Sequence, residues 1–514
     1  MCWGCLAVLG FDGYDTSDPG ATGAQAEGGV GDGSLVGDFA LTATPATVAL
    51  VKGGASATVM IGVQSGVGFS AAVALSATAV GTDLAATVDG LVVLPPATSA
   101  PVTISLVSSA TATVGKRTIS IRGTAGGLSH EVTIDVLVSA APGAIDTSFG
   151  DGGRATSAFA GSVVLEDMVI APDDSIVLAG TLTDDAGARS FAIARHRADG
   201  TLDPSFGSGG VVTTPLPGGA SGRLGGIVTL PDGKLLATGA SDTATAVFVA
   251  RYTSAGVLDA TFGTAGFATV VQPMNAVVML ARRPAGTLAL LGVAANKTRL
   301  VALAPSGALV TTFADAGVVD YPTTLIAAAG TLGADGRVSA AGNRAKSCTV
   351  AVFAADGTPA ELSPNLGFQC TTRGVAVDDA GYRGTVGYTT GPVGSPSQVT
   401  MTLLLPDGGV DPAFDASAPT GDGEGNAVTF DAQGRLVVGL TTELPAAMGV
   451  IRVRRDGTAD PTFGNGAVVN IAHPPAAEER TRRIALQSDG RIVVAGTLDV
   501  FPAPTTFRMT RLWP

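Results

Sequence analysis

The most regular pattern in the chain is a turn followed by a short run of apolar and small residues that ends at a glycine. It occurs seven times between residues 173 and 496, and DGKLLATG at 232–239 is a clear copy. Apolar runs on both sides of an Asp-Gly turn predict a β-hairpin, because both central residues of such a tight turn need positive φ. A repeat of about 50 residues indicates an array of one supersecondary unit. The repeat glycines are Gly180, Gly239, Gly292, Gly342, Gly387, Gly439 and Gly496.

Each repeat has the sequence of four short strands. In the second copy these are expected within 222–233, 234–241, 245–256 and 257–270. Seven units of four antiparallel strands predict a seven-bladed β-propeller, which would occupy residues 143–514. Because no helical periodicity of useful length occurs, the expected fold class is all-β.

A second motif, Leu-Asp-x-x-Phe-Gly-x-x-Gly, follows the third predicted strand of most repeats. Its Asp is expected to accept hydrogen bonds from turn N–H groups. Its Phe is expected to pack between neighbouring blades, where burying one ring is worth about 1.5–3 kcal/mol. One copy, LSPNLGFQC at 362–370, is degenerate. The six phenylalanines are Phe149, Phe206, Phe262, Phe313, Phe414 and Phe463.

The order of the motifs predicts how the ring closes. The last repeat ends at residue 514 after its third strand, and a spare Phe-Gly unit stands at 145–156, before the first hairpin. We therefore expect 145–156 to supply the outer strand of the last blade, beside 506–513. This pairing would leave no open sheet edge between chain start and chain end.

These repeats resemble the delta-60 repeat family, and FAIARHRADGTLDPSFGSGG at 191–210 matches its pattern almost letter for letter. The four-strand order is also similar to that of NHL-type propellers. The resemblance covers about residues 143–514 and implies a propeller on bacterial cell surfaces or in secreted proteins, with no catalytic residues to transfer. The fifth repeat departs from the pattern: 380–387 lacks the Asp, and 388–400 lacks the Ala-Arg-Tyr strand.

The first 139 residues have a residue pattern that differs from that of the repeats. Alternating Thr, Ala and Val with regular turn signals at 38–139 predict a β-sandwich that resembles bacterial Ig-like surface modules. Phe39, Phe69 and the segment 123–138 carry that resemblance. Residues 1–37 are expected to form an anchor and a disordered spacer. Trp3-Gly4-Cys5 resembles the end of a lipobox, which makes Cys5 a candidate lipid acceptor; the alternative is an ordinary frayed N-terminus.

Composition excludes several classes of function. The net charge is −13 and the pI about 4.7, opposite in sign to a nucleic-acid groove or an anionic-membrane surface. The only tryptophans are Trp3 and Trp513, which disfavours sugar-stacking lectins. No P-loop, HExxH or GxSxG motif is present, and there is no pair of CxxC motifs. We expect no metal and no cofactor. The Asp-Asp pair at 184–185 and the stretch GDGEGN at 421–426 are interpreted mainly as solvated turns, with a calcium loop as the alternative.

Histidines and third-strand arginines are interpreted as structural. Of His130, His196 and His473, His196 takes the strand position that Tyr252 has in the next repeat. An arginine recurs in the third strand, which favours a repeated ion pair, with the turn Asp as the candidate partner, over a single active site. Its copies are Arg195, Arg251, Arg452 and Arg511.

Two further groups of residues are singled out by position. The first predicted strands carry Glu166, Asp167 and four arginines, which would line the channel mouth as an anion site or form rim salt bridges. Cys348 and Cys370 are expected to lie towards the same face of the propeller, in adjacent blades. They would form either a disulfide or two buried free thiols. The four channel arginines are Arg223, Arg373, Arg482 and Arg483.

The function favoured by these observations is a non-enzymatic binding or scaffold protein. It would be exported to the cell surface, outer membrane or periplasm, and would present a propeller platform to an envelope protein or polymer. We expect a monomer that touches a membrane only through the possible lipid anchor. The alternatives are a propeller-type hydrolase or lyase with a site at the channel mouth, and a purely structural or adhesive surface unit.

Overall fold

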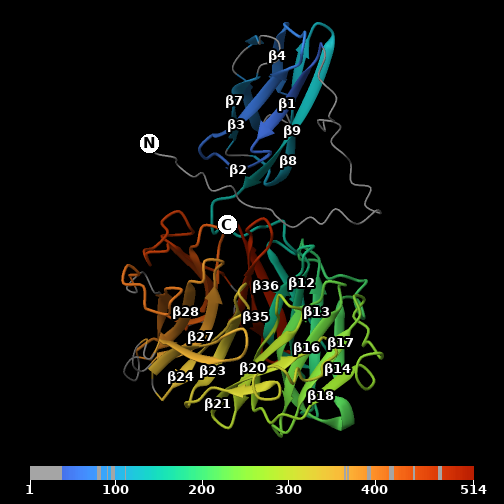
Figure 1. Ribbon diagram of the computed structural model, residues 1–514, viewed down its shortest axis with the longest axis vertical. Coiled ribbons are helices and arrows are strands. Elements are labelled where there is room, and N and C mark those ends of the chain that lie inside the picture. Colours follow the sequence, from blue (N-terminus) through green and yellow to red (C-terminus); the bar gives the residue numbers. More distant parts are fainter. Residues whose placement is uncertain are drawn as a thin grey trace. The chain divides into compact units, whose positions relative to one another are not determined.

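The computed structural model describes most of the 514-residue chain and divides it into two compact units, Met1–Ser139 and Ala140–Pro514 (Figure 1). The candidate anchor Cys5, nearly all of the predicted spacer and His473 lie outside the described residues. In the described part no helix is long and apolar enough to cross a membrane. The described residues are 37–77, 83–88, 91–93, 99–109, 112–345, 347–363, 366, 370–390, 395–415, 422–443, 446–472 and 477–514.

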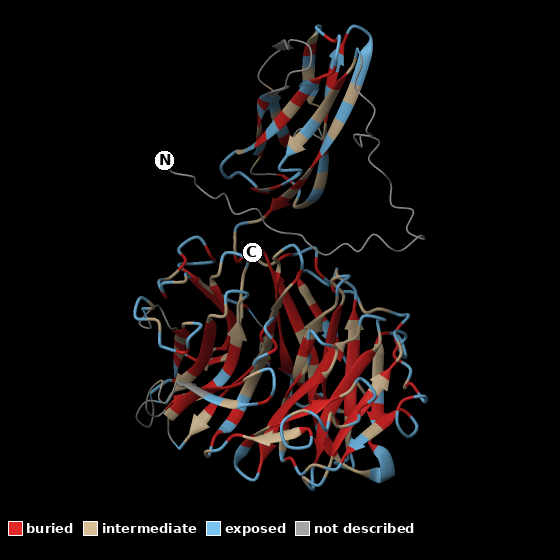
Figure 2. Ribbon diagram, viewed as in Figure 1, coloured by how far each residue is buried: buried red, intermediate tan, exposed pale blue. Residues whose placement is uncertain are grey.

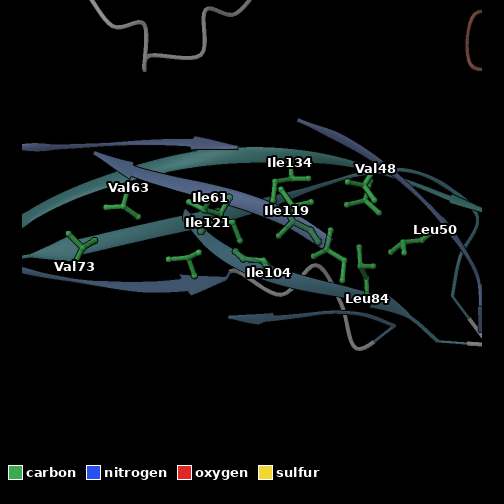
Figure 3. Packing of buried hydrophobic residues seen from close by; sticks show 14 of the residues in the cluster. Val48, Leu50, Ile61, Val63, Val73, Leu84, Ile104, Ile119, Ile121 and Ile134 are labelled. Atoms are coloured by element: carbon green, nitrogen blue, oxygen red, sulfur yellow. The ribbon is translucent and has the colours of Figure 1, made fainter. Parts of the chain in front are cut away.

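The first unit consists of two sheets around one apolar core. One sheet has the order β1(Phe39–Thr44), β3(Ala57–Ser65), β7(Ser99–Ser108), β5(Leu84–Val88). The other has the order β2(Thr47–Val51), β9(Leu128–Ser139), β8(Gly115–Ala125), β4(Ala72–Ala77), β6(Leu91–Val93). All pairs are antiparallel except β2 with β9. Ile61 and Ile104 of one sheet meet Ile119 and Ile134 of the other in the core (Figure 3), because alternate residues of each strand face inward.

The second unit contains the other seven sheets of the described residues, and in six of them four strands are described. Each sheet is an antiparallel meander in chain order, apart from the one that joins the two ends of the unit. The first three are β11(Ser162–Ile170), β12(Ile176–Thr183), β13(Arg189–His196), β14(Val211–Pro215); β15(Gly222–Thr229), β16(Leu235–Ser241), β17(Val247–Tyr252), β18(Phe267–Val270); and β19(Ala276–Arg282), β20(Leu288–Ala294), β21(Lys297–Leu303), β22(Val318–Asp320). The next three are β23(Ile326–Leu332), β24(Val338–Arg344), β25(Ser347–Phe353), β26(Pro359–Ser363); β27(Cys370–Val377), β28(Arg383–Thr389), β29(Gln398–Leu404); and β30(Glu424–Phe430), β31(Leu436–Thr441), β32(Met448–Val453), β33(Val468–Asn470). A short 3-10 helix, Pro217–Gly219, precedes β15.

The last sheet closes the unit with strands from both of its ends. It has the order β10(Arg154–Ser157), β36(Thr506–Leu512), β35(Ile492–Asp499), β34(Glu478–Leu486). The antiparallel pairing of Arg154 with Thr510 and of Ser157 with Phe507 is the closure that the displaced Phe-Gly unit predicts. The first strands of successive sheets contact one another in cyclic order, and β34 contacts β11, so the sheets form a closed ring.

In the sheets of this unit the second and third strands are the most buried, because they are covered on both faces (Figure 2). Every residue of β16 and of β20 is buried. In the sequence such strands are continuous runs of apolar and small residues, without alternation of apolar and polar positions. This explains the residue pattern of the repeated hairpin.

Neighbouring sheets are joined by a contact made of an arginine, an aspartate and a phenylalanine. In the first repeat Arg195 lies over the ring of Phe206, 4.6 Å from its centroid, and its Nε donates to Asp203 at 2.8 Å. Phe206 is fully buried against Gly256 of the next sheet, and Arg195 Nη1 donates to the carbonyl of Ser254 there. The same Arg–Asp ion pair and Arg–Phe stacking occur at Arg251, Arg452 and Arg511. The recurrent third-strand arginines are therefore structural, and the Phe ring packs between sheets. Phe313 and Phe414 are only partly buried.

Candidate functional site

The first strand of each of the seven sheets carries a β-bulge at the same level. In β11 the ladder skips from Leu165 to Asp167, which leaves Glu166 unpaired with β12. A bulge turns the side chain of the extra residue in a new direction and is frequent beside binding sites. The seven residues in the bulge position are Glu166, Gly225, Val278, Ala328, Arg373, Asn426 and Arg482.

The repeat glycine is needed because of this bulge. Gly180 is paired with Leu165 directly before the bulge, and a Cβ added to Gly180 would lie closer than 3.0 Å to the carbonyl oxygen of Val164. The same approach to a first-strand carbonyl occurs at five of the other six repeat glycines. At Gly439 the added Cβ would instead meet Thr481 Cγ2 of the next sheet at 2.8 Å. Only a residue without a side chain lets the two strands come this close.

The bulge residues together form a ring around the central channel of the unit, and we call them the ring residues. They line one chamber of about 170 Å³ to which all seven first strands contribute. A larger cavity of about 530 Å³ continues along the same strands, beyond the ring, between residues such as Ile227, Leu280 and Val428. A further chamber of about 170 Å³, lined by Glu424, Arg480 and Thr481, lies before the ring and shares Arg373 and Arg482 with it.

The ring is polar on one side and small or apolar on the other. Arg373, Asn426, Arg482 and Glu166 follow one another around the ring and form what we call the polar arc. Gly225, Val278 and Ala328 complete the circle. The polar arc combines two guanidinium groups, an amide and one carboxylate in a small cavity.

Neighbouring side chains hold the polar arc in place. Arg373 Nη2 donates to Tyr388 Oη at 3.3 Å, and its guanidinium lies 5.6 Å from the centroid of that ring. Asn426 Nδ2 donates to Thr441 Oγ1 at 2.9 Å, which also accepts the N–H of Thr481 at 3.0 Å. Next to the arc, Arg483 Nε donates to Asp167 Oδ1 at 3.1 Å.

Burial moves the pKa of the two most enclosed charges towards neutrality. Burial raises the pKa of Glu166, and the positive charges of Arg482, Arg483 and Arg223 offset this effect only in part. Burial lowers the pKa of Arg482, although Glu166 opposes the shift. Both directions are those expected for charges held away from water without a close counter-ion.

The structure brings together three of the four predicted channel arginines. Arg373, Arg482 and Arg483 line the ring chamber. Arg223 is an exposed residue of β15, two positions before ring residue Gly225, and lines none of the three cavities. Reasoning from the sequence missed Asn426 and the ring itself. The sequence holds one signal, which is recognisable only once the bulge is known: each ring residue lies 14 residues before its repeat glycine, or 13 before Gly439.

The described histidines and acidic turns have structural partners. Among the described residues no group of three or more His, Cys, Asp or Glu side chains is placed to hold a metal ion. Buried His196 contacts Ser157 Oγ through Nε2 at 2.7 Å and the carbonyl of Gly200 through Nδ1 at 2.8 Å. His130 pairs with Asp38 at 2.8 Å, and Asp184 accepts N–H groups of its own turn.

A disulfide joins the fourth and fifth sheets of the second unit. Cys348 at the start of β25 and Cys370 at the start of β27 have an S–S distance of 2.03 Å and Cα atoms 5.8 Å apart. Both residues are buried. The bond therefore connects two adjacent sheets.

Comparison with known proteins supports the fold. Residues 171–206, 230–262 and 487–514 match the family described as "Domain of unknown function (DUF5122) beta-propeller". With the closed ring of sheets, this match shows that the second unit is a β-propeller. The matched segments contain the hairpins of the first, second and last repeats. No curated protein matches the sequence.

Several solved structures are similar at low identity. A quinoprotein alcohol dehydrogenase-like protein from Bacteroides thetaiotaomicron is 10% identical, with a TM-score of 0.36 over 91% of this chain and 96% of its own. Sqt1 from Chaetomium thermophilum is 13% identical, with a TM-score of 0.43 over 67% of this chain and 83% of its own. A PQQ-bound aldose sugar dehydrogenase from Streptomyces coelicolor is 12% identical, with a TM-score of 0.34 over 72% of this chain and 100% of its own. At these scores the likenesses do not indicate what this chain binds.

Proposed function

We propose that the chain is an exported, non-enzymatic binding or scaffold protein. An Ig-like sandwich would present a seven-bladed propeller of delta-60-type repeats, and the polar arc would take the anionic group of a ligand. The observation that carries this proposal is the pair Arg373 and Arg482. Both line one small chamber, and no carboxylate among the described residues lies within 4.0 Å of either guanidinium. Two such groups are suited to bind a carboxylate or a phosphate.

The make-up of the cavities favours binding over catalysis. Among the described residues that line the three channel cavities there is no Ser, Cys or His, and therefore no pair of such a nucleophile and an imidazole base. One observation supports the alternative hypothesis that the protein is an enzyme. Glu166 has a raised pKa in a cavity, which suits a general acid or base, so a hydrolase or lyase is our second candidate. A structural or adhesive surface unit would need no ligand at all.

Export and partners are part of the same proposal. The bond between Cys348 and Cys370 supports an oxidising compartment, because disulfides persist mainly in exported proteins. We propose an envelope protein or polymer as the partner of the platform, a monomeric state, and lipidation of Cys5 as the only membrane contact. Metabolic labelling with a radioactive fatty acid tests the last point. Wild type should be labelled and Cys5→Ser should not.

Calorimetric titration of the full chain with acetate and with inorganic phosphate tests the anion site. Wild type should bind at least one of the two anions, and Arg373→Gln and Arg482→Gln should each weaken that binding tenfold or more. Arg189→Gln is the matched control, because Arg189 is a surface residue paired with Asp242 and remote from the cavities. Binding that is unchanged in both channel variants would contradict the proposed site. Steady conversion of a bound ligand would instead support the enzyme.

A further inference from the structure

Charges of both signs face the ring chamber without forming ion pairs. Glu166, Arg373 and Arg482 all line its wall. Among the described residues no cation lies within 4.0 Å of the Glu166 carboxylate. The buried Nε of Arg482 also has no hydrogen-bond partner there. By contrast, Arg483 beside them is paired with Asp167, so it does not neutralise Glu166 at close range.

This arrangement is unfavourable for an empty protein and for a simple ion. Glu166 and Arg482 are half-buried, whereas Arg373 is exposed. A half-buried charge without a close partner loses part of its hydration, which a correctly placed ligand charge recovers. A plain anion bound by Arg373 and Arg482 would lie beside the like charge of Glu166. A plain cation bound by Glu166 would meet two arginines. A ligand that carries an anionic and a cationic group close together, for example on one carbon atom, satisfies all three side chains.

The ring chamber, which adjoins the larger cavity, by itself has the size of a small ligand. Its volume of about 170 Å³ is below the range of about 300–1,000 Å³ that is typical of pockets for drug-sized molecules. Gly225, Val278 and Ala328 lie across from the polar arc, where small side chains suit a ligand with a short side chain of its own. The described residues that line the chamber include no aromatic ring on which a sugar or base could stack.

We propose that the ring chamber binds a small free α-amino acid. Its carboxylate would contact Arg373 and Arg482, and its ammonium group would contact Glu166. Asn426, between the two arginines on the polar arc, would offer its amide to the carboxylate. The inference rests on the proposed function and specifies the ligand class of that same site.

Calorimetric titration of the full wild-type chain at pH 7.5 tests the proposal without any variant. The probes are L-alanine, glycine and L-serine, with propionate as the anion that lacks the ammonium group and ethylammonium as the cation that lacks the carboxylate. We expect at least one of the amino acids to bind ten times more tightly than either single-charge probe. Equal affinity for L-alanine and propionate would overturn the amino-acid assignment and leave the anion site standing. Failure of every probe, propionate and phosphate included, would overturn both.

Two substitutions then assign the charges. Glu166→Gln should weaken amino-acid binding at least tenfold and leave propionate binding unchanged or tighter. Arg482→Gln should weaken both. Arg189→Gln should change neither. Loss of propionate binding in Glu166→Gln, with the fold intact by circular dichroism, would overturn the role of Glu166 as the ammonium partner.

Discussion

At the scale of single residues, the repeated contact explains why most repeats carry the same arginine, aspartate and phenylalanine. The third repeat shows how the contact changes when two of the three are replaced. Although burial raises the pKa of Asp203, the hydrogen bonds from Ser205 and the charge of Arg195 together hold it below its ordinary value. In the third repeat Ala302 and Val310 replace the arginine and the aspartate. Arg283, from the end of the first strand, supplies the guanidinium over Phe313 instead, 4.7 Å from the ring centroid. It has no aspartate, and its buried Nε and Nη2 lack partners among the described residues.

The two arginines should therefore respond differently to substitution. Arg195→Met should destabilise the propeller by about 3 kcal/mol, because it leaves the mostly buried Asp203 without its ion-pair partner. Arg283→Met should cost less than about 1 kcal/mol or stabilise, since it removes a buried and unpaired cation. Urea denaturation of both variants measures the difference. An Arg283→Met variant that loses as much stability as Arg195→Met would contradict this account.

His196 makes stability dependent on pH. Burial lowers the pKa of His196 from its ordinary 6.5, and the backbone carbonyl of Gly200 opposes this only in part. The unfolded chain therefore binds the proton more readily than the folded one. Stability should be complete above about pH 6.5 and should fall as the pH drops below the unfolded value.

His196→Tyr should remove this acid sensitivity. Tyr252 occupies the same position in the next repeat and donates to Thr214 Oγ1 at 2.9 Å, and Ser157 is the corresponding hydroxyl near His196. Urea midpoints of wild type and variant at pH 7.5 and pH 5.0 give the comparison. If the wild type loses no more stability than the variant between these pH values, His196 is not the titrating group.

At the scale of elements, the hairpins were predictable and the ring was not. Asp-Gly turns between apolar runs, as at 232–239, are local signals that fix strand pairs. The seven bulges depend on contacts between strands, and a single sequence shows them only as a recurring glycine. For that reason Arg373, Arg482 and Arg483 could be chosen as charged residues of first strands, whereas Asn426 could not. Arg223 was chosen on the same grounds, yet it lies two residues before the ring.

The pairing of repeat glycine and bulge can be tested at Gly239. An added Cβ would approach the carbonyl oxygen of Arg223 closer than 3.0 Å, and backbone cannot yield as a flexible side chain does. Gly239→Ala should destabilise by about 1–3 kcal/mol, as overpacking does. Gly409→Ala is the control. Its nearest neighbour, Asp407 Oδ1, would lie 3.3 Å from the new Cβ, so the change should stay within about 0.5 kcal/mol. Equal stability of both variants would show that the close approach does not require glycine.

At the scale of the whole molecule, the closed ring of sheets holds together only if every junction between neighbouring sheets is stable. Most junctions have a motif phenylalanine, such as Phe206 against Gly256 or Phe149 against Gly200. The degenerate repeat has Leu366 in that position, and the following sheet has only three described strands. The bond between Cys348 and Cys370 spans this same junction. We infer that the disulfide stabilises this junction in place of the missing phenylalanine.

Replacing both cysteines by alanine should therefore weaken the propeller at one place. The bond joins residues 22 apart, and a loop of that size is worth about 3 kcal/mol in the chain-entropy account. We expect a loss of about that size in urea denaturation, and faster amide hydrogen exchange in β27 and β28 than in β12 and β16. Wild type treated with a reductant should reproduce both effects, whereas the alanine variant should not respond to it. Exchange that rises equally in all four strands would show that the bond does not act on this junction alone, and unchanged stability would contradict the inference altogether.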